Sequence, residues 1–434
     1  MSAKEFELVL LLIGVAVALG AVARRLAVPY PVLLVVAGFL LGVQDWTIDY
    51  ALPPWVVFNA FLPPLLYAAA FNTNWSAFRG QFRAIVLLAV GLVLFTTGLV
   101  AWAAHDWLGM GWGPAFVLGA VVSPPDAVAA AAVAARVPLP RTVVTLLEGE
   151  SLVNDASALV CYTVAVGAVV TGGVSGVEVA AKFLLVPSGG LLLGLAGGWL
   201  VCHLHRWLDR HDLADSKLHI TLTLLTPFAL YLPAEHLHVS GVLAAVAGGL
   251  YVGSQAERVF AAELMVEARA VWESMEFILN AVIFTLVGFT YSAIRQQIKD
   301  GSSPWELAVA AGTVALVLIV SRILWVFPGA YVPRWLDHKL CGCREPYPPA
   351  NAVAVVAWTG MRGVVSLAAA LALPEKTATG QDFPDRGLIQ FLTFWAVFAT
   401  LVGQGLTLPY VIRWLRVKQF PHLKVHPPGV SPTD

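Results

Sequence analysis

Long apolar runs constrain the fold of this chain more than any other feature of its sequence. They recur from end to end of the 434 residues, and each is about 18–25 residues long, which is enough to cross a bilayer as a helix. Only 12% of the residues are charged, about half the share of a soluble chain. The alternating pattern of a membrane β-barrel is missing from the sequence. We therefore predict an all-α polytopic membrane protein.

Hydropathy and loop residues indicate about thirteen transmembrane helices. Their expected limits are 5–26, 29–43, 54–71, 84–105, 113–135, 142–170, 179–202, 218–234, 238–254, 271–291, 304–328, 351–374 and 387–412. Residues 255–270 are expected to form an amphipathic connector on the inner surface. Lys and Arg are concentrated in alternate loops, and the positive-inside rule then predicts an outside N-terminus and a cytoplasmic C-terminus in the cell membrane.

One expected span, 142–170, carries an unusual number of polar residues. It contains Glu148-Gly149-Glu150-Ser151-Leu152-Val153-Asn154-Asp155. On a helix, Glu150 lies beside Asn154 and Ser151 beside Asp155, one turn apart in each case. Ionisable groups at bilayer depth are costly, so this face must meet protein or water. We interpret it as the wall of an ion site.

Two other expected spans are interrupted near their centres. In the span 113–135, a Pro-Pro pair precedes Asp126, and adjacent prolines interrupt a helix. In the span 351–374, two glycines flank Arg362. The two spans run in opposite directions, as inverted repeats would place them. Paired interruptions of this kind are typical of the central site of a transporter.

Five charged residues are expected in one layer of the membrane. At 1.5 Å per residue from the inner end of each span, all of them lie about 9–20 Å deep. They are Asp126, Glu150, Asp155, Arg322 and Arg362. Two guanidinium groups cannot neutralise three carboxylates, and an unpaired buried carboxylate is stable only when it is protonated or cation-bound.

The polar residues near the unpaired carboxylate could have purely structural roles instead of binding an ion. Glu150 is interpreted as the partner of a buried arginine. Ser151 and Asn154, each taken alone, would be explained by hydrogen bonds between helices. Asp155 is the residue that such roles explain least well.

Three motifs occur in order along the chain. They are Ser-Pro-Pro-Asp-Ala-Val-Ala at 123–129, Glu-Gly-Glu-Ser-Leu-Val-Asn-Asp at 148–155 and Met-Arg-Gly-Val-Val-Ser-Leu-Ala at 361–368. Together with Leu62-Pro63-Pro64-Leu65-Leu66, they resemble the sodium–proton exchangers of the first cation–proton antiporter family. That family includes the NhaP-type bacterial antiporters and the animal Na⁺/H⁺ exchangers, and the resemblance covers nearly the whole membrane part.

The resemblance implies a homodimer in which a core domain moves against a dimerisation domain, with two crossed discontinuous helices in the core. The implied division is dimerisation helices in 1–83 and 171–303, core halves in 84–170 and 304–418, and a short cytoplasmic tail in 419–434.

The resemblance also implies the roles of the site residues. Asp155 would carry cation and proton, and the transported Na⁺ would be held by Asp155, Ser151 and the Pro125 carbonyl. Asn154 would be their neighbour, Asp126 and Arg362 would lie at the helix breaks, and Glu150 would pair with Arg322. The chain departs from the family at Pro125, where Thr is frequent, and at Ala68, where many members have Glu.

We expect exchange of Na⁺ for H⁺ by alternating access, with a role in pH homeostasis. The exchange is expected to be electroneutral, because the Asn154-Asp155 pair offers one titrating carboxylate. Exchange of K⁺, or a preference for Li⁺, on the same scaffold is the alternative within transport. We expect no cofactor, no nucleic-acid partner and free thiols at all four cysteines.

The rival of another class is a membrane-embedded enzyme. His205 and Asp209 form an acyltransferase-like H-x3-D pair, expected in a cytoplasmic loop. No nucleophile, zinc or nucleotide motif accompanies the pair, so we interpret the spacing as coincidental.

Overall fold

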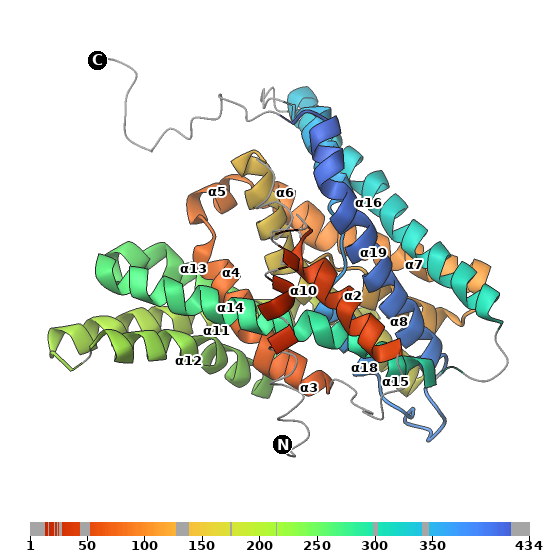
Figure 1. Cartoon of the computed structure of the whole chain (residues 1–434), viewed down its shortest axis with the longest axis horizontal. Helices are drawn as coiled ribbons and strands as arrows, with labels where there is room; N and C mark the ends of the chain where they lie inside the picture. Colours follow the sequence, from red (N-terminus) through yellow and green to blue (C-terminus); the bar gives the residue numbers. More distant parts are fainter. Residues whose placement is uncertain are drawn as a thin grey trace.

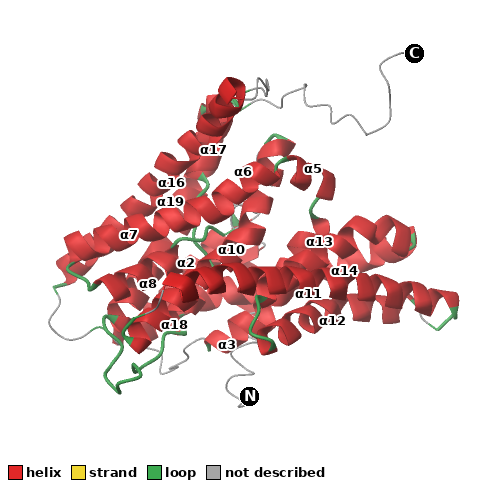
Figure 2. Cartoon of the chain, turned by 180° about the vertical axis from the view of Figure 1, so that it is seen from behind, coloured by secondary structure: helices red, strands yellow, loops and turns green. Residues whose placement is uncertain are grey.

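The computed structural model describes residues 28–43, 53–126, 139–173, 176–213, 215–296, 303–340 and 347–417, with residue 298 and scattered positions between 14 and 25. Within these residues the chain is helical, apart from turns and an isolated β-bridge between Lys376 and Asp382 (Figure 2). The predicted all-α fold is confirmed.

The expected spans from the second onward coincide with helices of the described chain. In the first part these are α2 (Tyr30–Val43), α3 (Pro54–Val56), the π-helical η1 (Val57–Phe61), α4 (Leu62–Asn72), α5 (Trp75–Gly80), α6 (Phe82–Val86), the π-helical η2 (Leu87–Leu92), α7 (Val93–Leu108), α8 (Trp112–Val122) and α10 (Arg141–Thr171). The remaining helices are α11 (Gly176–Arg210), α12 (Ser216–His236), α13 (Gly241–Val259), α14 (Ala262–Phe289), α15 (Tyr291–Gln296), α16 (Pro304–Leu340), α17 (Ala350–Trp358), α18 (Val364–Leu371) and α19 (Arg386–Trp414).

These helices differ in whether they are long and apolar enough to cross a membrane. Among the described residues, seven helical segments are long and apolar enough to cross a membrane, and α2 and α8 are shorter apolar helices. Helices α12 and α13 form where spans are expected but are not among the seven. The first expected span, 5–26, lies mostly outside the described residues.

The amphipathic connector expected at residues 255–270 is wrong. Helix α13 continues to Val259 and α14 begins at Ala262, so most of the segment extends two long helices. The charged residues that suggested a surface helix lie on these helix extensions. Phe260, in the short turn between them, is buried against the ring of His205, with 4.8 Å between the ring centroids.

The helices gather into two groups on either side of α10. Opposite views show α11, α12 and α13 on one side and α7, α16 and α19 on the other (Figures 1 and 2). Glycines allow close packing within the first group, as is usual between membrane helices. A Cβ at Gly194 of α11 would lie 2.3 Å from the Ala244 carbonyl oxygen of α13. Helices α14 and α2, outside that group, pack as closely: a Cβ at Gly288 of α14 would lie 2.1 Å from the Val35 carbonyl oxygen of α2.

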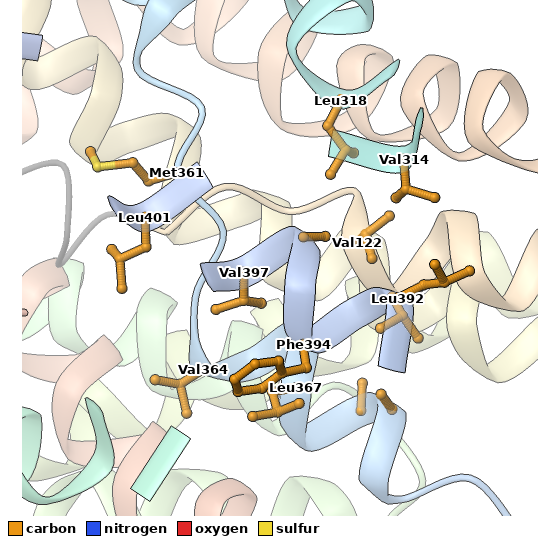
Figure 3. Packing of buried hydrophobic residues seen from close by; sticks show 14 of the residues in the cluster. Val122, Val314, Leu318, Met361, Val364, Leu367, Leu392, Phe394, Val397 and Leu401 are labelled. Atoms are coloured by element: carbon orange, nitrogen blue, oxygen red, sulfur yellow. The ribbon is translucent and has the colours of Figure 1, made fainter. Parts of the chain in front are cut away.

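The second group encloses a continuous apolar core. Side chains from α8, α16, α18 and α19 interdigitate there (Figure 3). Val122, Leu318, Leu367 and Leu401 are among the fully buried members. Val122, the last residue of α8, Met361, within the second break, and Val364, the first residue of α18, belong to this core.

Candidate ion site at the crossed helix breaks

The two predicted interruptions are present and touch each other. Helix α8 ends at Val122 and is followed by non-helical backbone to Asp126, while α17 ends at Trp358 and α18 begins at Val364. The backbone N–H of Asp126 donates to the carbonyl oxygen of Met361 at 2.7 Å. Residues 127–138, which include the rest of the expected span 113–135, lie outside the described residues.

Arg362 joins the two breaks through its side chain. Its Nε donates to the carbonyl oxygen of Val122 at 2.7 Å, and its Nη1 donates to that of Gly360 at 2.8 Å. The residue is completely buried. The C-terminal end of a helix carries unsatisfied carbonyl groups and about half a negative charge. One guanidinium group therefore satisfies carbonyls at the ends of α8 and α17.

Asp126 lies against the opposite kind of helix end. A Cβ at Gly363 would come within 2.0 Å of Asp126 Oδ2, so the carboxylate packs directly on the glycine. Gly363 immediately precedes α18, and the N-terminal end of a helix favours negative charge. Each charged residue at the crossing thus meets a half-helix end of opposite sign.

Glu150 and Arg322 form a buried, bidentate ion pair. Arg322 Nη1 donates to Glu150 Oε1 at 2.5 Å, and Nη2 donates to Oε2 at 2.8 Å. Each residue is 1% exposed. Arg322 Nε also donates to the carbonyl oxygen of Val356 in α17 at 3.0 Å. The structure thus brings together the two residues that the sequence pairs, and both oxygens of Glu150 are engaged.

Asn154 fastens α10 to the first break. Its Nδ2 donates to the carbonyl oxygen of Pro125 at 2.9 Å, and the side chain is completely buried. A carbonyl oxygen has two lone pairs, so the Pro125 carbonyl keeps one for another partner. The structure places Asn154 as the support of that carbonyl.

A cavity of about 70 Å³ adjoins these groups. Asp126, Ser151, Asp155 and Pro125 all line it. Asp155 is 7% exposed, and its carboxylate has no hydrogen-bond or ion-pair partner within the described part of the chain. A cavity needs only about 10–15 Å³ to hold one water, so the space has room for a small cation together with water.

The cavity also contains two polar residues that the sequence reasoning did not select, Asn280 of α14 and Ser366 of α18. Ser366 belongs to the third motif. Asn280 is a single amide within the apolar stretch 278–284, and a polar residue in such a stretch is a signal that could have identified it.

Ala68, where many family members have Glu, lies away from the cavity beside Asp155. Ala68 is buried and lines a separate cavity of about 330 Å³, which Tyr67 and Trp272 also line. It does not line the smaller cavity beside Asp155. The α4 side chains that do line the smaller cavity are apolar.

His205 and Asp209 are engaged in a contact between helices. Both lie on α11 and not in a loop. His205 is completely buried, with its Nδ1 2.7 Å from His219 Nδ1, and Asp209 Oδ1 lies 2.8 Å from His219 Nε2. Cys161 and Cys202 are free thiols, and Cys341 and Cys343 lie outside the described residues.

Comparison with known proteins identifies the family. The family described as sodium/hydrogen exchanger, transmembrane, matches residues 9–414. An uncharacterized Na⁺/H⁺ exchanger of Mycobacterium tuberculosis is 38% identical over 407 residues, which cover 91% of this chain and 72% of the relative. A sodium, potassium, lithium and rubidium/H⁺ antiporter of Bacillus pumilus is 34% identical over 388 residues, which cover 88% of this chain and 57% of that protein.

A solved structure shares the fold. The sodium proton antiporter MjNhaP1 from Methanocaldococcus jannaschii, solved at pH 8, matches with a TM-score of 0.70 at 19% identity, covering 94% of this chain and 98% of that chain. These relatives are transporters and not enzymes. The protein is a multi-pass membrane transporter, and it belongs to the sodium/hydrogen exchanger family of cation/proton antiporters.

Proposed function

We propose that the protein exchanges Na⁺ for H⁺ at one shared site, with Asp155 as the group that binds either. The observation that carries this proposal is the contrast between two acidic residues of α10. Glu150 is engaged through both oxygens by Arg322, whereas Asp155 faces the small cavity without a partner in the described chain. An isolated buried carboxylate must bind a proton or a cation.

The oxygen atoms around the cavity suit a monovalent cation. Asp155, Ser151 and the Pro125 carbonyl would hold the ion, and Asp126 would contribute negative charge from the break. Sodium ions bind to such hard oxygen donors, and broken-helix carbonyls at mid-membrane supply them in other transporters. A proton on Asp155 removes the charge that attracts the cation. Competition for one carboxylate then couples the two fluxes.

The cavity lies on the boundary between two proposed moving parts. The core domain would comprise 84–170 and 304–418, and the dimerisation domain would comprise 1–83 and 171–303. One wall of the cavity, with Asp126 and Asp155, belongs to the first part, and the other wall, with Leu66 and Asn280, belongs to the second. Sliding the first wall along the second would expose the site to alternate sides of the membrane.

The cellular setting follows from the same proposal. The protein would act as a homodimer in the cell membrane, with its N-terminus outside and its C-terminus in the cytoplasm, and would contribute to pH homeostasis. The lipid bilayer is its solvent. No cofactor is required, because the chemistry is binding and release at side-chain oxygens.

Asp155→Asn tests the proposal. The substitution keeps size and hydrogen-bonding capacity but removes the titrating group, so we expect a folded protein without exchange. The measurement is cation-driven proton movement in vesicles that contain the purified protein and a pH-sensitive dye. Asp337→Asn, at a partly exposed surface pair with Arg83, is the matched control and should keep the wild-type rate. Normal exchange by Asp155→Asn would refute the assignment.

The same assay decides the cation. A relative is named as an antiporter of sodium, potassium, lithium and rubidium, which supports K⁺ and Li⁺ as alternative cargo. We expect the wild-type protein to give the lowest apparent KM with Na⁺, the cation by which its family is described. A lower apparent KM for K⁺ would replace Na⁺/H⁺ exchange with K⁺/H⁺ exchange.

A further inference from the structure

The wall of the small cavity that faces Asp155 is apolar with one exception. Leu62, Leu65 and Leu66 of α4 form most of it, together with Ile283 of α14. Asn280 of α14 is the polar side chain among the residues with which η1, α4 and α14 line the cavity. It is therefore the one group on that wall that offers an oxygen to an ion.

Asn280 is buried with half of its amide unsatisfied. The residue is 5% exposed, and its Oδ1 has no hydrogen-bond partner within the described residues. Its side chain also lies near the hydroxyl of Tyr30 of α2. An unsatisfied buried polar atom lowers the stability of the fold. A leucine at this position would avoid that cost, so packing alone does not account for the asparagine.

We infer that Asn280 is a further cation-contacting residue, which binds the transported ion directly or through one water and helps to set its affinity. An amide oxygen replaces part of the hydration shell of a cation without adding charge. Loss of the amide should therefore lower the affinity for the cation more than the affinity for the proton, because the proton binds to Asp155 alone. Because Asn280 lies on the wall opposite the helix breaks, it contacts the ion only while the core domain stands in the position seen here. This inference rests on the proposed antiport at Asp155.

The test compares Asn280→Leu with two other substitutions in proteoliposomes. Asn280→Leu removes the amide at similar volume. Thr285→Val is the matched control, because Thr285 is buried on the same helix, donates to Ala281 and does not line the cavity. Tyr30→Phe removes the tyrosine hydroxyl but keeps the amide. Apparent KM for Na⁺, Li⁺ and K⁺, maximal rate and the rise in Tm with added Na⁺ are measured for each.

We expect Asn280→Leu to raise the apparent KM for Na⁺ about tenfold, the effect of one lost hydrogen-bond-sized contact. The maximal rate should be retained, and the Na⁺-dependent rise in Tm should shrink. Thr285→Val and Tyr30→Phe should keep the KM within about twofold of wild type, since neither removes the ion contact. If Asn280→Leu does not fold, Asn280→Ser shortens the side chain and is expected to shift KM in the same direction.

Three results would contradict these statements in different ways. An unchanged KM in Asn280→Leu, with normal wild-type exchange, would overturn the role of Asn280 and leave the antiport intact. A raised KM in Tyr30→Phe equal to that of Asn280→Leu would assign the amide to helix packing. Absence of cation-dependent proton movement in wild-type vesicles would instead refute the proposed function itself.

Discussion

The Glu150–Arg322 pair allows a quantitative prediction about stability. Both side chains are 1% exposed, and two hydrogen bonds of 2.5 and 2.8 Å join them. Two unit charges about 4 Å apart attract each other by about 4 kcal/mol at the effective dielectric constant of a protein interior. Breaking such a pair from one side costs about 3–5 kcal/mol, because the remaining charge stays buried. Arg322→Met and Glu150→Leu should each lower the free energy of unfolding by about this amount.

The double variant should be more stable than either single variant. Two apolar side chains leave no uncompensated charge, and such replacements of buried pairs are often neutral. Recovery should fall short of wild type by about 1 kcal/mol, because the carbonyl of Val356 loses the donor Arg322 Nε. The coupling energy of the cycle should therefore be at least about 5 kcal/mol.

Unfolding of the purified protein in detergent, followed by tryptophan fluorescence, gives the required free energies; the chain has 15 tryptophans. Asp337→Asn at the more exposed Arg83–Asp337 pair is the control, and it should change stability by less than about 1 kcal/mol. A double variant as unstable as the sum of the singles would refute the reasoning. It would mean that the two charges do not compensate each other in the folded protein.

Two further predictions concern the helix crossing and charge movement. Gly363→Ala should abolish exchange, because the added Cβ would lie 2.0 Å from Asp126 Oδ2. The control Gly403→Ala, with open space around its Cβ, should exchange at the wild-type rate. Equal exchange rates for the two variants in vesicles would show that the contact between Gly363 and Asp126 is dispensable. Exchange of one cation for one proton at Asp155 should be electroneutral. Exchange rates measured in vesicles, with the membrane potential clamped by an ionophore, should therefore not depend on the voltage. A voltage-dependent rate would indicate a second proton carrier such as Asp126.

The site could be predicted where buried charge and broken helices dictate it. Asp126 and Arg362 occur beside Pro-Pro and Gly-x-x-Gly sequences, which weaken a helix and, beside a buried charge, indicate a break. Proline alone is not sufficient, because Pro63 and Pro64 lie within helix α4. Glu150 and Arg322 lie at similar depth on apolar helices, and buried charges at one depth pair. The helix breaks and the buried ion pair can therefore be predicted from the hydropathy pattern, whereas the hydrogen bonds between these residues are known from the structure.

The remaining features depend on helix rotation and packing, which hydropathy does not encode. Asn280 lines the cavity because α14 turns that face toward it. The sequence marks Asn280 as a polar residue in an apolar stretch but does not say whether it meets an ion or a neighbouring helix. Asn154 sits beside Asp155 in sequence, yet its amide supports Pro125. The segment 255–270 departs from the expected surface connector because charged residues extend long helices as readily as they mark a surface helix. The close α11–α13 packing depends on small residues such as Gly194, whose partner is known only from the fold.

The arrangement of charges also explains why one carboxylate can be the carrier. Glu150 is neutralised by Arg322, Arg362 is held by carbonyls at two helix ends, and Asp126 rests on the start of α18. All of these compensating groups lie within the proposed core domain, so a movement of that domain leaves each of them in place. In the proposed exchange, Asp155 alone depends on what it binds, and with either a proton or a monovalent cation its local charge would be zero. The proposed core domain would then carry the same charge across the membrane in both directions. The unloaded site, with its bare buried carboxylate, would be the state least able to move.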